Sequence, residues 1–298
     1  MTQKKAEILL AAVIAARATS LLFSKIAMNG MGIFNLLAAR FLMAFVLLAV
    51  VFFKRLRHIK RHTLVRGAIM GGLFFLMLST ELTGLKSTPS STVSLLENTA
   101  IILVPMAEAV LRHKLPKAAT AVSALVAIGG VALLTGQSGG FTPGMVLAVM
   151  AAVLYAAAII TTDRFSHEDD PLTLGIVQVG TLGLLALVSS FVFEAPHLPQ
   201  SGTQWLMIAG LAVICTGFGF TLQPVAQSHT TAQRAGLFCA LSPACATLLG
   251  AAVLSGLVFL LFGGGPNGMA AALTSMLCMG APLSSTPVSY THLTLPTT

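Results

Sequence analysis

Ionisable side chains interrupt several long apolar runs of this sequence. Arg17, Arg40 and Glu97 each lie within an apolar run of about 20 residues, the length that crosses a bilayer as a helix. A charge at the centre of such a helix costs about 2.5–3.5 kcal/mol on insertion scales, so each of these residues requires a partner or a function. A guanidinium suits a carboxylate ligand, and a buried glutamate suits proton exchange or the binding of an amine.

Arg40 and Glu97 are the strongest candidates for ligand binding or ion coupling. Arg40 lies near the middle of its run and either holds a ligand carboxylate, exchanges partners with Glu97, or forms a fixed structural ion pair. Glu97, with the amide of Asn98 beside it, either cycles a proton, binds a cationic amine, or pairs with Arg40.

The remaining candidates have weaker signals. Arg17 is central in the first run, and Tyr155 occupies the matching place in the second half; for Tyr155, packing with its hydroxyl bonded to a neighbour is the simpler interpretation. Lys25 lies near the outer end of the first run, where it can also snorkel, and Gln178 either lines a polar path or joins helices. Pro105 and Pro243 predict kinks, which form hinges in some membrane proteins and are static in others.

Two further glutamates have structural explanations. Glu81 is predicted near the outer end of its helix, paired with Lys25 or Lys86. Glu108 lies one turn before Arg112, which predicts an ion pair at the inner surface.

The sequence carries no constellation typical of an enzyme. G-x-S-x-G, H-E-x-x-H and P-loop motifs are absent, and the four cysteines have no paired spacing. The acidic segment His167–Asp170 has the residue types of a metal site but is better explained as a solvated loop. We therefore predict no catalytic residues, no metal and no cofactor.

Composition requires a membrane to solvate these runs. Apolar residues make up 56% of the chain and charged residues only 9%, with a mean hydropathy of +0.90. The runs are continuous rather than alternating, which favours helices over a β-barrel. They predict an all-α bundle of nine transmembrane spans: 6–28, 31–53, 66–85, 91–111, 118–136, 144–163, 171–193, 204–225 and 232–256.

The basic residues predict the orientation of this bundle. With a cytoplasmic N-terminus, thirteen of the seventeen Lys and Arg residues fall in inner loops and only Lys86 in an outer one. This bias fits a bacterial inner membrane. The basic stretch Lys54–Arg66 is then a topology anchor beside the lipid bilayer rather than a nucleic-acid site.

The order of spans repeats with inverted topology. A shift of 138 residues places Arg17 on Tyr155, Arg40 on Gln178 and Pro105 on Pro243. Five helices separate the two starts, so the second copy is inverted, as in many secondary transporters. We predict a first five-helix repeat over 1–136 and a second repeat, with four helices present, over 137–256.

Several segments resemble the EamA-type permeases of the drug/metabolite transporter superfamily. Lys25 ends the first helix and Arg40-Phe41 lies in the second, while Glu97–Lys117, Ala124–Gly136 and Thr230–Gly256 resemble the family's fourth, fifth and ninth helices. The resemblance covers about residues 6–256. It implies ten helices, both termini in the cytoplasm, and export or exchange of small metabolites, including amino acids and related solutes, by alternating access.

The chain departs from this family at three points. Arg17-Ala18 stands where the family often has Trp-Gly, Leu257 follows Gly256 where a glutamate is usual, and no tenth span follows. The last residues, Val288–Thr298, back-translate to a sequence that resembles a transposase end used in sequencing libraries. We therefore interpret 257–298 as an aberrant tail, with a frameshift or adaptor read-through from about 288; a natural disordered tail is the alternative.

The sequence thus predicts an efflux transporter of small molecules. A homodimer is compatible with it. Two alternatives stay open, namely a membrane scaffold or sensor that transports nothing, and a truncated transporter without function.

Overall fold

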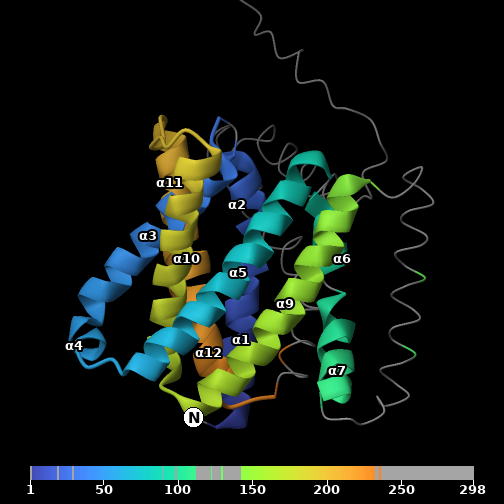
Figure 1. Ribbon diagram of the computed structural model, residues 1–298, viewed down its shortest axis with the longest axis vertical. Coiled ribbons are helices and arrows are strands. Elements are labelled where there is room, and N and C mark those ends of the chain that lie inside the picture. The colour runs from blue at the N-terminus through green and yellow to red at the C-terminus, as the bar shows by residue number, and fades with distance from the viewer. Residues whose placement is uncertain are drawn as a thin grey trace, which may run out of the picture. The chain divides into compact units, whose positions relative to one another are not determined.

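Helices make up all the regular structure in the part of the chain that the computed structural model describes, residues 2–18, 20–28, 30–88, 90–97, 99–111, 122, 129, 142–231 and 235. Figure 1 shows their arrangement. The elements are α1 (Gln3–Ala18), α2 (Ser20–Ala27), α3 (Ile33–Val51), α4 (Phe53–Leu56), α5 (Arg61–Ser87), α6 (Ser90–Glu97), α7 (Ala100–Leu111), α9 (Pro143–Glu168), α10 (Pro171–Phe193), α11 (Gly202–Gly210), the π-helix η1 (Leu211–Phe220) and α12 (Thr221–Gln227).

Five continuous helical segments are long and apolar enough to cross a membrane. They are Ile33–Val51, Arg61–Ser87, Pro143–Glu168, Pro171–Phe193 and Gln204–Gln227, and they confirm the predicted all-α transmembrane bundle. The first predicted span is helical on both sides of residue 19, which is not described, in α1 and α2, and the fourth predicted span contains two shorter helices, α6 and α7. The predicted spans 118–136 and 232–256, and the tail 257–298, lie outside the described residues apart from single positions.

Capping side chains define the starts of α9, α10 and α11. The Thr142 side chain accepts a hydrogen bond from the Met145 N–H at the start of α9, and Asp170 caps α10 in the same way. Ser201 and Gln204 form a reciprocal capping box at the start of α11. These caps allow apolar helices to follow one another after connections of only a few residues.

Small residues allow α10 to pack closely between α3 and α5. A Cβ atom on Gly180 would lie 2.7 Å from the Phe45 ring, and one on Gly71 would lie 2.8 Å from the Gln178 carbonyl oxygen. Leu42 lies opposite Gly183 in the same way, so α3 and α10 run antiparallel. Close packing of small residues replaces the hydrophobic effect as the force that joins helices in lipid.

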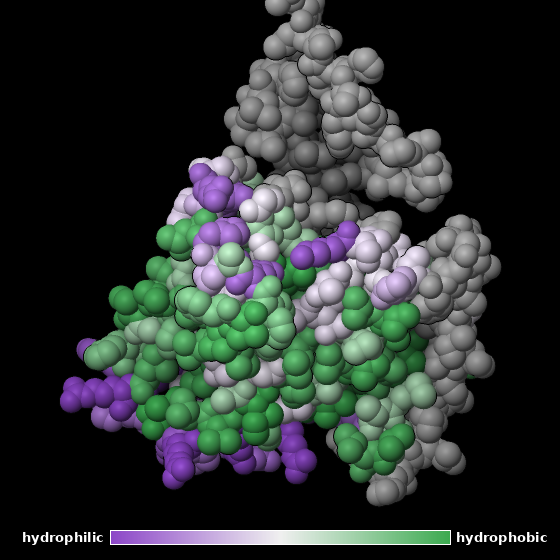
Figure 2. Space-filling view, turned by 45° about the horizontal axis from the view of Figure 1, so that its top comes forward, coloured by the Kyte–Doolittle hydropathy of each residue, from purple (hydrophilic) through white to green (hydrophobic). Residues whose placement is uncertain are grey.

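The outer face of these helices is apolar. Val110 is 74% exposed and Phe193 is 72% exposed, values that are unfavourable in water but suit contact with lipid. Figure 2 shows apolar side chains across the middle of the visible face and polar side chains toward its edges. This distribution matches a helical bundle whose middle is embedded in a bilayer.

Polar networks join the helices at the two ends of the bundle. At one end, Arg66 of α5 binds Glu168 at 2.5 Å and Asp169 at 2.6 Å, in the connection between α9 and α10. At the other end, the Glu194 carboxylate accepts hydrogen bonds from the backbone N–H of Phe34 at 3.3 Å and of Asn35 at 3.0 Å, which caps α3. The first network lies at the end that carries the basic stretch Lys54–Arg66.

Candidate functional site

Arg17 lies at the end of α1 in a box of three aromatic rings, those of Phe74, Tyr155 and Phe220. Its guanidinium carbon lies 4.3 Å from the Phe220 centroid, 5.0 Å from that of Tyr155 and 5.7 Å from that of Phe74. Its Nη1 donates to the Tyr155 hydroxyl at 3.0 Å and to Oε1 of Gln223 at 2.7 Å. Cation–π contacts and hydrogen bonds thus stabilise this charge inside the bundle.

The meeting of Arg17 and Tyr155 agrees with the internal repeat. The two residues are 138 positions apart, the predicted repeat shift, and they come from the first helix of each half. The Tyr155 hydroxyl is bonded to a neighbour, as the simpler interpretation of this residue predicted, but that neighbour is a charged group at the centre of the molecule.

Arg40 of α3 is 1% exposed and is held by neutral oxygens. Its Nε donates to the Thr216 hydroxyl at 2.7 Å and its Nη1 to the Ser20 hydroxyl at 2.8 Å. Its Nη2 is buried without a hydrogen-bond partner. Within the described chain no carboxylate reaches ion-pair distance of this guanidinium, so the structure does not show the predicted pair with Glu97.

Glu81 and Glu97 bring two carboxyl groups into the same region. Glu81 is 5% exposed and Glu97 is partly buried, and the two carboxyl groups are close enough to act on each other electrostatically. Arg17 is close enough to both to act on them electrostatically, and Arg40 acts on Glu81. Among the described residues Glu81 forms no ion pair with Lys86, and the side chain of Lys25, its other predicted partner, lies outside the described residues.

The π-helix η1 provides residues of the second half that contact Arg17 and Arg40. Thr216 binds Arg40, and Phe220 lies under Arg17 and 5.9 Å from the Arg40 guanidinium carbon. The Cys215 thiol donates to the Ala16 carbonyl oxygen at 3.0 Å, which joins η1 to α1. A π-helix widens the spacing between turns and frequently marks a functional site.

The other predicted site residues lie elsewhere or are not described. Gln178 is 1% exposed, and neither polar atom of its amide has a hydrogen-bond partner. Because α3 and α10 are antiparallel, with Phe45 opposite Gly180, Gln178 lies closer than Arg40 to the end of the bundle that carries Lys54. The repeat counterparts Arg40 and Gln178 are therefore not brought together as Arg17 and Tyr155 are.

The side chains of Lys25 and Asn98, and the whole of Pro243, lie outside the described residues. Pro105, a predicted hinge, lies inside α7. A further proline inside a helix, Pro224 of α12, follows directly after η1 and was not singled out from the sequence.

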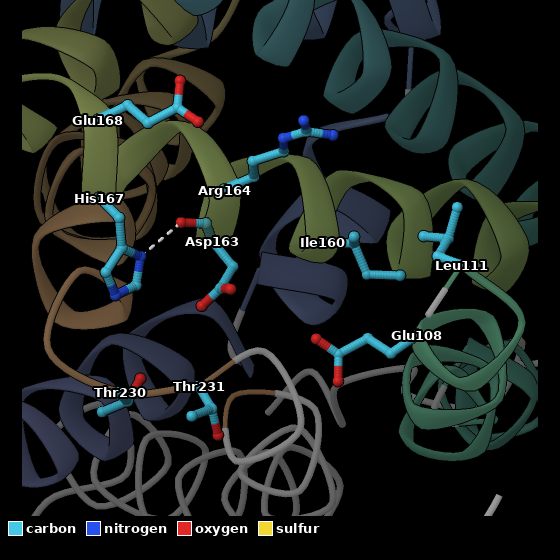
Figure 3. Close-up of a pocket in the computed structure, with 9 residues that line it drawn as sticks. All are labelled: Glu108, Leu111, Ile160, Asp163, Arg164, His167, Glu168, Thr230 and Thr231. Atoms are coloured by element: carbon cyan, nitrogen blue, oxygen red, sulfur yellow. Dashed lines mark hydrogen bonds between the residues drawn. The ribbon is translucent and has the colours of Figure 1, made fainter. Parts of the chain in front are cut away.

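A pocket of about 710 Å³ opens at the end of the bundle that carries the Arg66 network. It lies between the last turns of α7 and α9 and the segment after α12, as Figure 3 shows. Most of the residues that line it are polar or charged by type; they are Glu108, Leu111, Ile160, Asp163, Arg164, His167, Glu168, Thr230 and Thr231. In the described residues no group of His, Cys, Asp and Glu side chains has the arrangement of a metal site.

Acidic residues of the segment His167–Asp170 are paired with basic residues. Asp169 accepts hydrogen bonds from Arg66 and Thr63 and lies 2.9 Å from His62, and Asp170 lies 3.6 Å from Arg55. Burial alone would raise the pKa of Asp169, but the hydrogen bonds from Arg66, Thr63 and His62 outweigh it and hold that pKa below its usual range.

Comparison with known proteins agrees with this architecture. Residues 4–136 and 142–264 match the EamA-like transporter family. No curated protein matches the chain at a comparable level. Among 18 matching chains of solved structures, one protein crystal structure has a TM-score of 0.64 and 20% sequence identity, over 93% of this chain and 95% of that chain, which supports the fold alone.

Two family matches in succession cover most of the chain, and the described helices form the transmembrane bundle that such matches require. The chain belongs to the EamA-like transporter family, a family of integral membrane proteins that transport small solutes.

Proposed function

We propose that this protein is a secondary transporter that exports small metabolites bearing a carboxylate, such as amino acids and related solutes, by alternating access. The observation that carries the proposal is the buried Nη2 of Arg40, a cationic donor without a hydrogen-bond partner at the centre of the bundle. A buried donor that lacks a partner costs about 1–3 kcal/mol, and more when it is charged, so a ligand oxygen at this position is favoured.

The partners of Arg40 support a site between the two halves. Ser20 belongs to the first repeat and Thr216 to the second, and both leave the positive charge uncompensated. A carboxylate is the ligand group that best matches a guanidinium, because it accepts two charge-assisted hydrogen bonds in parallel. Secondary transporters with inverted repeats commonly bind substrate at this position.

The unequal ends of the bundle support alternating access. The pocket of about 710 Å³ lies at the end with the Arg66 network, while Glu194 ties α3 to the segment after α10 at the opposite end. The basic residues gather at the end with the pocket, so we infer that this end faces the cytoplasm, that the N-terminus is cytoplasmic, and that the protein resides in a bacterial inner membrane.

Transport by reconstituted protein tests this proposal. Vesicles that contain the full chain are loaded with a panel of labelled amino acids and other carboxylates, and efflux is measured. We expect efflux of at least one carboxylate, and a loss of about 10–100-fold in Arg40→Ala, since charge-assisted hydrogen bonds contribute about 1.5–3 kcal/mol. Gln178→Ala is a matched control, because it also removes a buried polar side chain, but one that lies closer than Arg40 to the end of the bundle that carries Lys54.

Two outcomes would contradict the proposal. If Arg40→Ala inserts normally and transports as well as the unmodified protein, Arg40 is not the binding group. If no solute moves but a stable protein partner is recovered, the chain is a membrane scaffold or sensor. A chain that inserts poorly and moves nothing would instead support the truncated, inactive alternative.

A further inference from the structure

The aromatic box around Arg17 has the composition of a binding site for an organic cation. Its three rings, those of Phe74, Tyr155 and Phe220, have centroids 5.7, 5.0 and 4.3 Å from the guanidinium carbon. Proteins bind quaternary ammonium ligands with a similar cage of aromatic faces. The Tyr155 hydroxyl and Oε1 of Gln223 add two acceptors, both within hydrogen-bond distance of the same nitrogen. The box therefore offers π faces and oxygen acceptors to a cation that carries N–H groups.

The rings of the box are held in place by one another. Phe74 meets Tyr155 edge to face with 6.3 Å between centroids, and it meets Phe220 in the same way at 5.3 Å. Phe220 also packs edge to face against Phe41, at 5.3 Å. These rings come from four elements, α3, α5, α9 and η1, and all of them are buried. Because edge-to-face pairs are favourable by themselves, we expect the box to keep its shape when the side chain of residue 17 is shortened.

Arg17 enters this box from a fifth element, α1. A Cβ atom on Gly219 of η1 would lie 2.8 Å from Cγ of Arg17, so the glycine makes room for the stem of the arginine side chain. Arg17 is only partly buried, which leaves a way for small ions to reach its surroundings. The guanidinium thus fills, from within the chain, a position that suits a free cation.

We propose that Arg17 is a specificity-determining residue that keeps small organic cations out of the central site, because its guanidinium fills an aromatic box that binds such cations when it is free. The ligands of the free box are guanidinium and small alkylated ammonium ions. Phe220 lies 5.9 Å from the Arg40 guanidinium carbon, so the box adjoins the group proposed to hold the substrate carboxylate. This inference rests on the proposed transport function and deepens it, since exported solutes then bind through a carboxylate and not through a cationic group in the box.

Rescue of Arg17→Ala by a free cation tests whether the box binds one. The unfolding temperature of the full chain in detergent micelles is measured with guanidinium chloride up to about 50 mM, far below the molar range in which this salt denatures proteins. We expect a saturable rise of about 2–5 °C in the variant and no rise in the unmodified protein, since a ligand that binds only the folded state stabilises it by mass action. Urea, which has a similar planar shape without a charge, and sodium chloride should give no saturable rise.

A double variant shows whether the rings carry this effect. Arg17→Ala with Phe220→Leu lacks the ring nearest to the guanidinium, and the rise should fall below about 1 °C. Arg17→Ala with Phe193→Leu loses an exposed ring of the same size and should keep the full rise. If Arg17 has only a structural role, guanidinium stabilises neither double variant. Should Arg17→Ala unfold on extraction, the same test is the yield of monodisperse protein, which guanidinium should increase at least about threefold.

Efflux of tetramethylammonium from vesicles tests the selectivity itself. We expect the unmodified protein to export this ion no faster than vesicles without protein do. Arg17→Ala should export it at least about tenfold faster than the unmodified protein, because the three rings are then free to bind it. Arg66→Ala, which removes an arginine from the ion-pair network at the end of the bundle, should export it no faster than the unmodified protein.

The outcomes distinguish this inference from the function on which it rests. The inference is overturned if guanidinium does not stabilise Arg17→Ala, if urea stabilises it equally, or if the rise persists without the Phe220 ring, whether or not the chain transports anything. Equal export of tetramethylammonium by the unmodified protein and Arg17→Ala also overturns it and leaves the transporter proposal intact. Rescue by guanidinium without flux of any solute in the wider panel supports the box as a cation site and contradicts the transporter proposal.

Discussion

Two networks in this molecule use the same residue types in opposite ways. At the end of the bundle, Arg66 binds Glu168 and Asp169 directly, so that each charge has an oppositely charged neighbour. At the centre, Arg40 binds the hydroxyls of Ser20 and Thr216 and keeps one donor free. The first network is saturated and joins helices, whereas the second is unsaturated in the place where an unsaturated charge costs most.

This difference identifies where a ligand is needed. A saturated ion-pair network gains nothing from a further anion, while the central guanidinium gains a partner. Substitutions of Arg40 and its partners should therefore change transport, whereas substitutions around Arg66 should leave transport nearly unchanged. The predictions below test this separation, beginning with the largest expected effect.

Replacing Arg17 by alanine should have the largest effect on stability. The change removes two hydrogen bonds of a charged group and three aromatic contacts that join α1 to α5, α9, η1 and α12, and we expect a loss of about 3 kcal/mol in the free energy of unfolding. Unfolding in mixed detergent micelles measures it. Arg17→Lys should retain part of the cation–π contribution, and an unchanged unfolding midpoint in Arg17→Ala would show that the box is not a structural centre.

Replacing Thr216 by valine tests the π-helix contact with Arg40. Valine has the same shape but no hydroxyl, so Nε of Arg40 loses its acceptor at a cost of about 1–3 kcal/mol, and we expect carboxylate efflux to fall about tenfold. Efflux from vesicles measures the effect. Thr83→Val removes a hydroxyl that bonds only its own helix, and it should have no effect on efflux. Equal rates in the two variants would contradict the role given to η1.

Replacing Phe220 by leucine should weaken the contacts of both central arginines, Arg17 and Arg40. The ring lies 4.3 Å from the Arg17 guanidinium carbon and 5.9 Å from that of Arg40, and loss of these contacts should reduce stability by about 0.5–2 kcal/mol. Phe193→Leu, on the exposed end of α10, is the matched control for ring volume. If the two variants unfold alike, the aromatic box contributes little.

Replacing Asp169 by asparagine should have the smallest effect, and that effect should depend on pH. Because the pKa of Asp169 in the folded protein lies below its usual value, the carboxylate stabilises the fold above the pKa of the unfolded chain, about 3.9, and this contribution is lost as the pH falls through the folded pKa. We expect the variant to be about 1 kcal/mol less stable at pH 7, because part of the network is exposed to solvent. The difference should disappear in acid, and unfolding of both proteins across pH measures it.

The sequence predicted the bundle more completely than the site. Continuous apolar runs predicted the helices α3, α5, α9 and α10, because their length and hydropathy follow directly from the thickness of a bilayer. The π-helix η1 was missed, since it does not change the hydropathy of its run.

The site was predicted where charge or repetition gave a signal. Arg17, Arg40 and Glu97 stood out as charges in apolar runs, and the shift of 138 residues paired Arg17 with Tyr155. Phe74 and Phe220 gave no signal, because aromatic residues in a membrane helix are as common on the lipid face as around a cation. Gln223 lay too close to the predicted end of its span to be noticed.

Glu81 shows why depth in a span is not enough. It was predicted near the outer end of its helix, but within α5 it is buried, with only 5% of its surface exposed. The face of a helix that is buried depends on the neighbouring helices. When the helix is apolar on all sides, the sequence pattern does not predict which face this is.

The most direct test compares Arg40→Lys with Arg66→Lys in carboxylate efflux from vesicles. Both changes keep one positive charge and remove the planar guanidinium, one in the unsaturated network and one in the saturated network. We predict that Arg40→Lys lowers efflux about 10–100-fold and that Arg66→Lys lowers it less than about twofold, since only Arg40 binds the ligand. Equal rates for the two variants, or a larger loss in Arg66→Lys, would contradict the assignment of Arg40 as the substrate-binding residue.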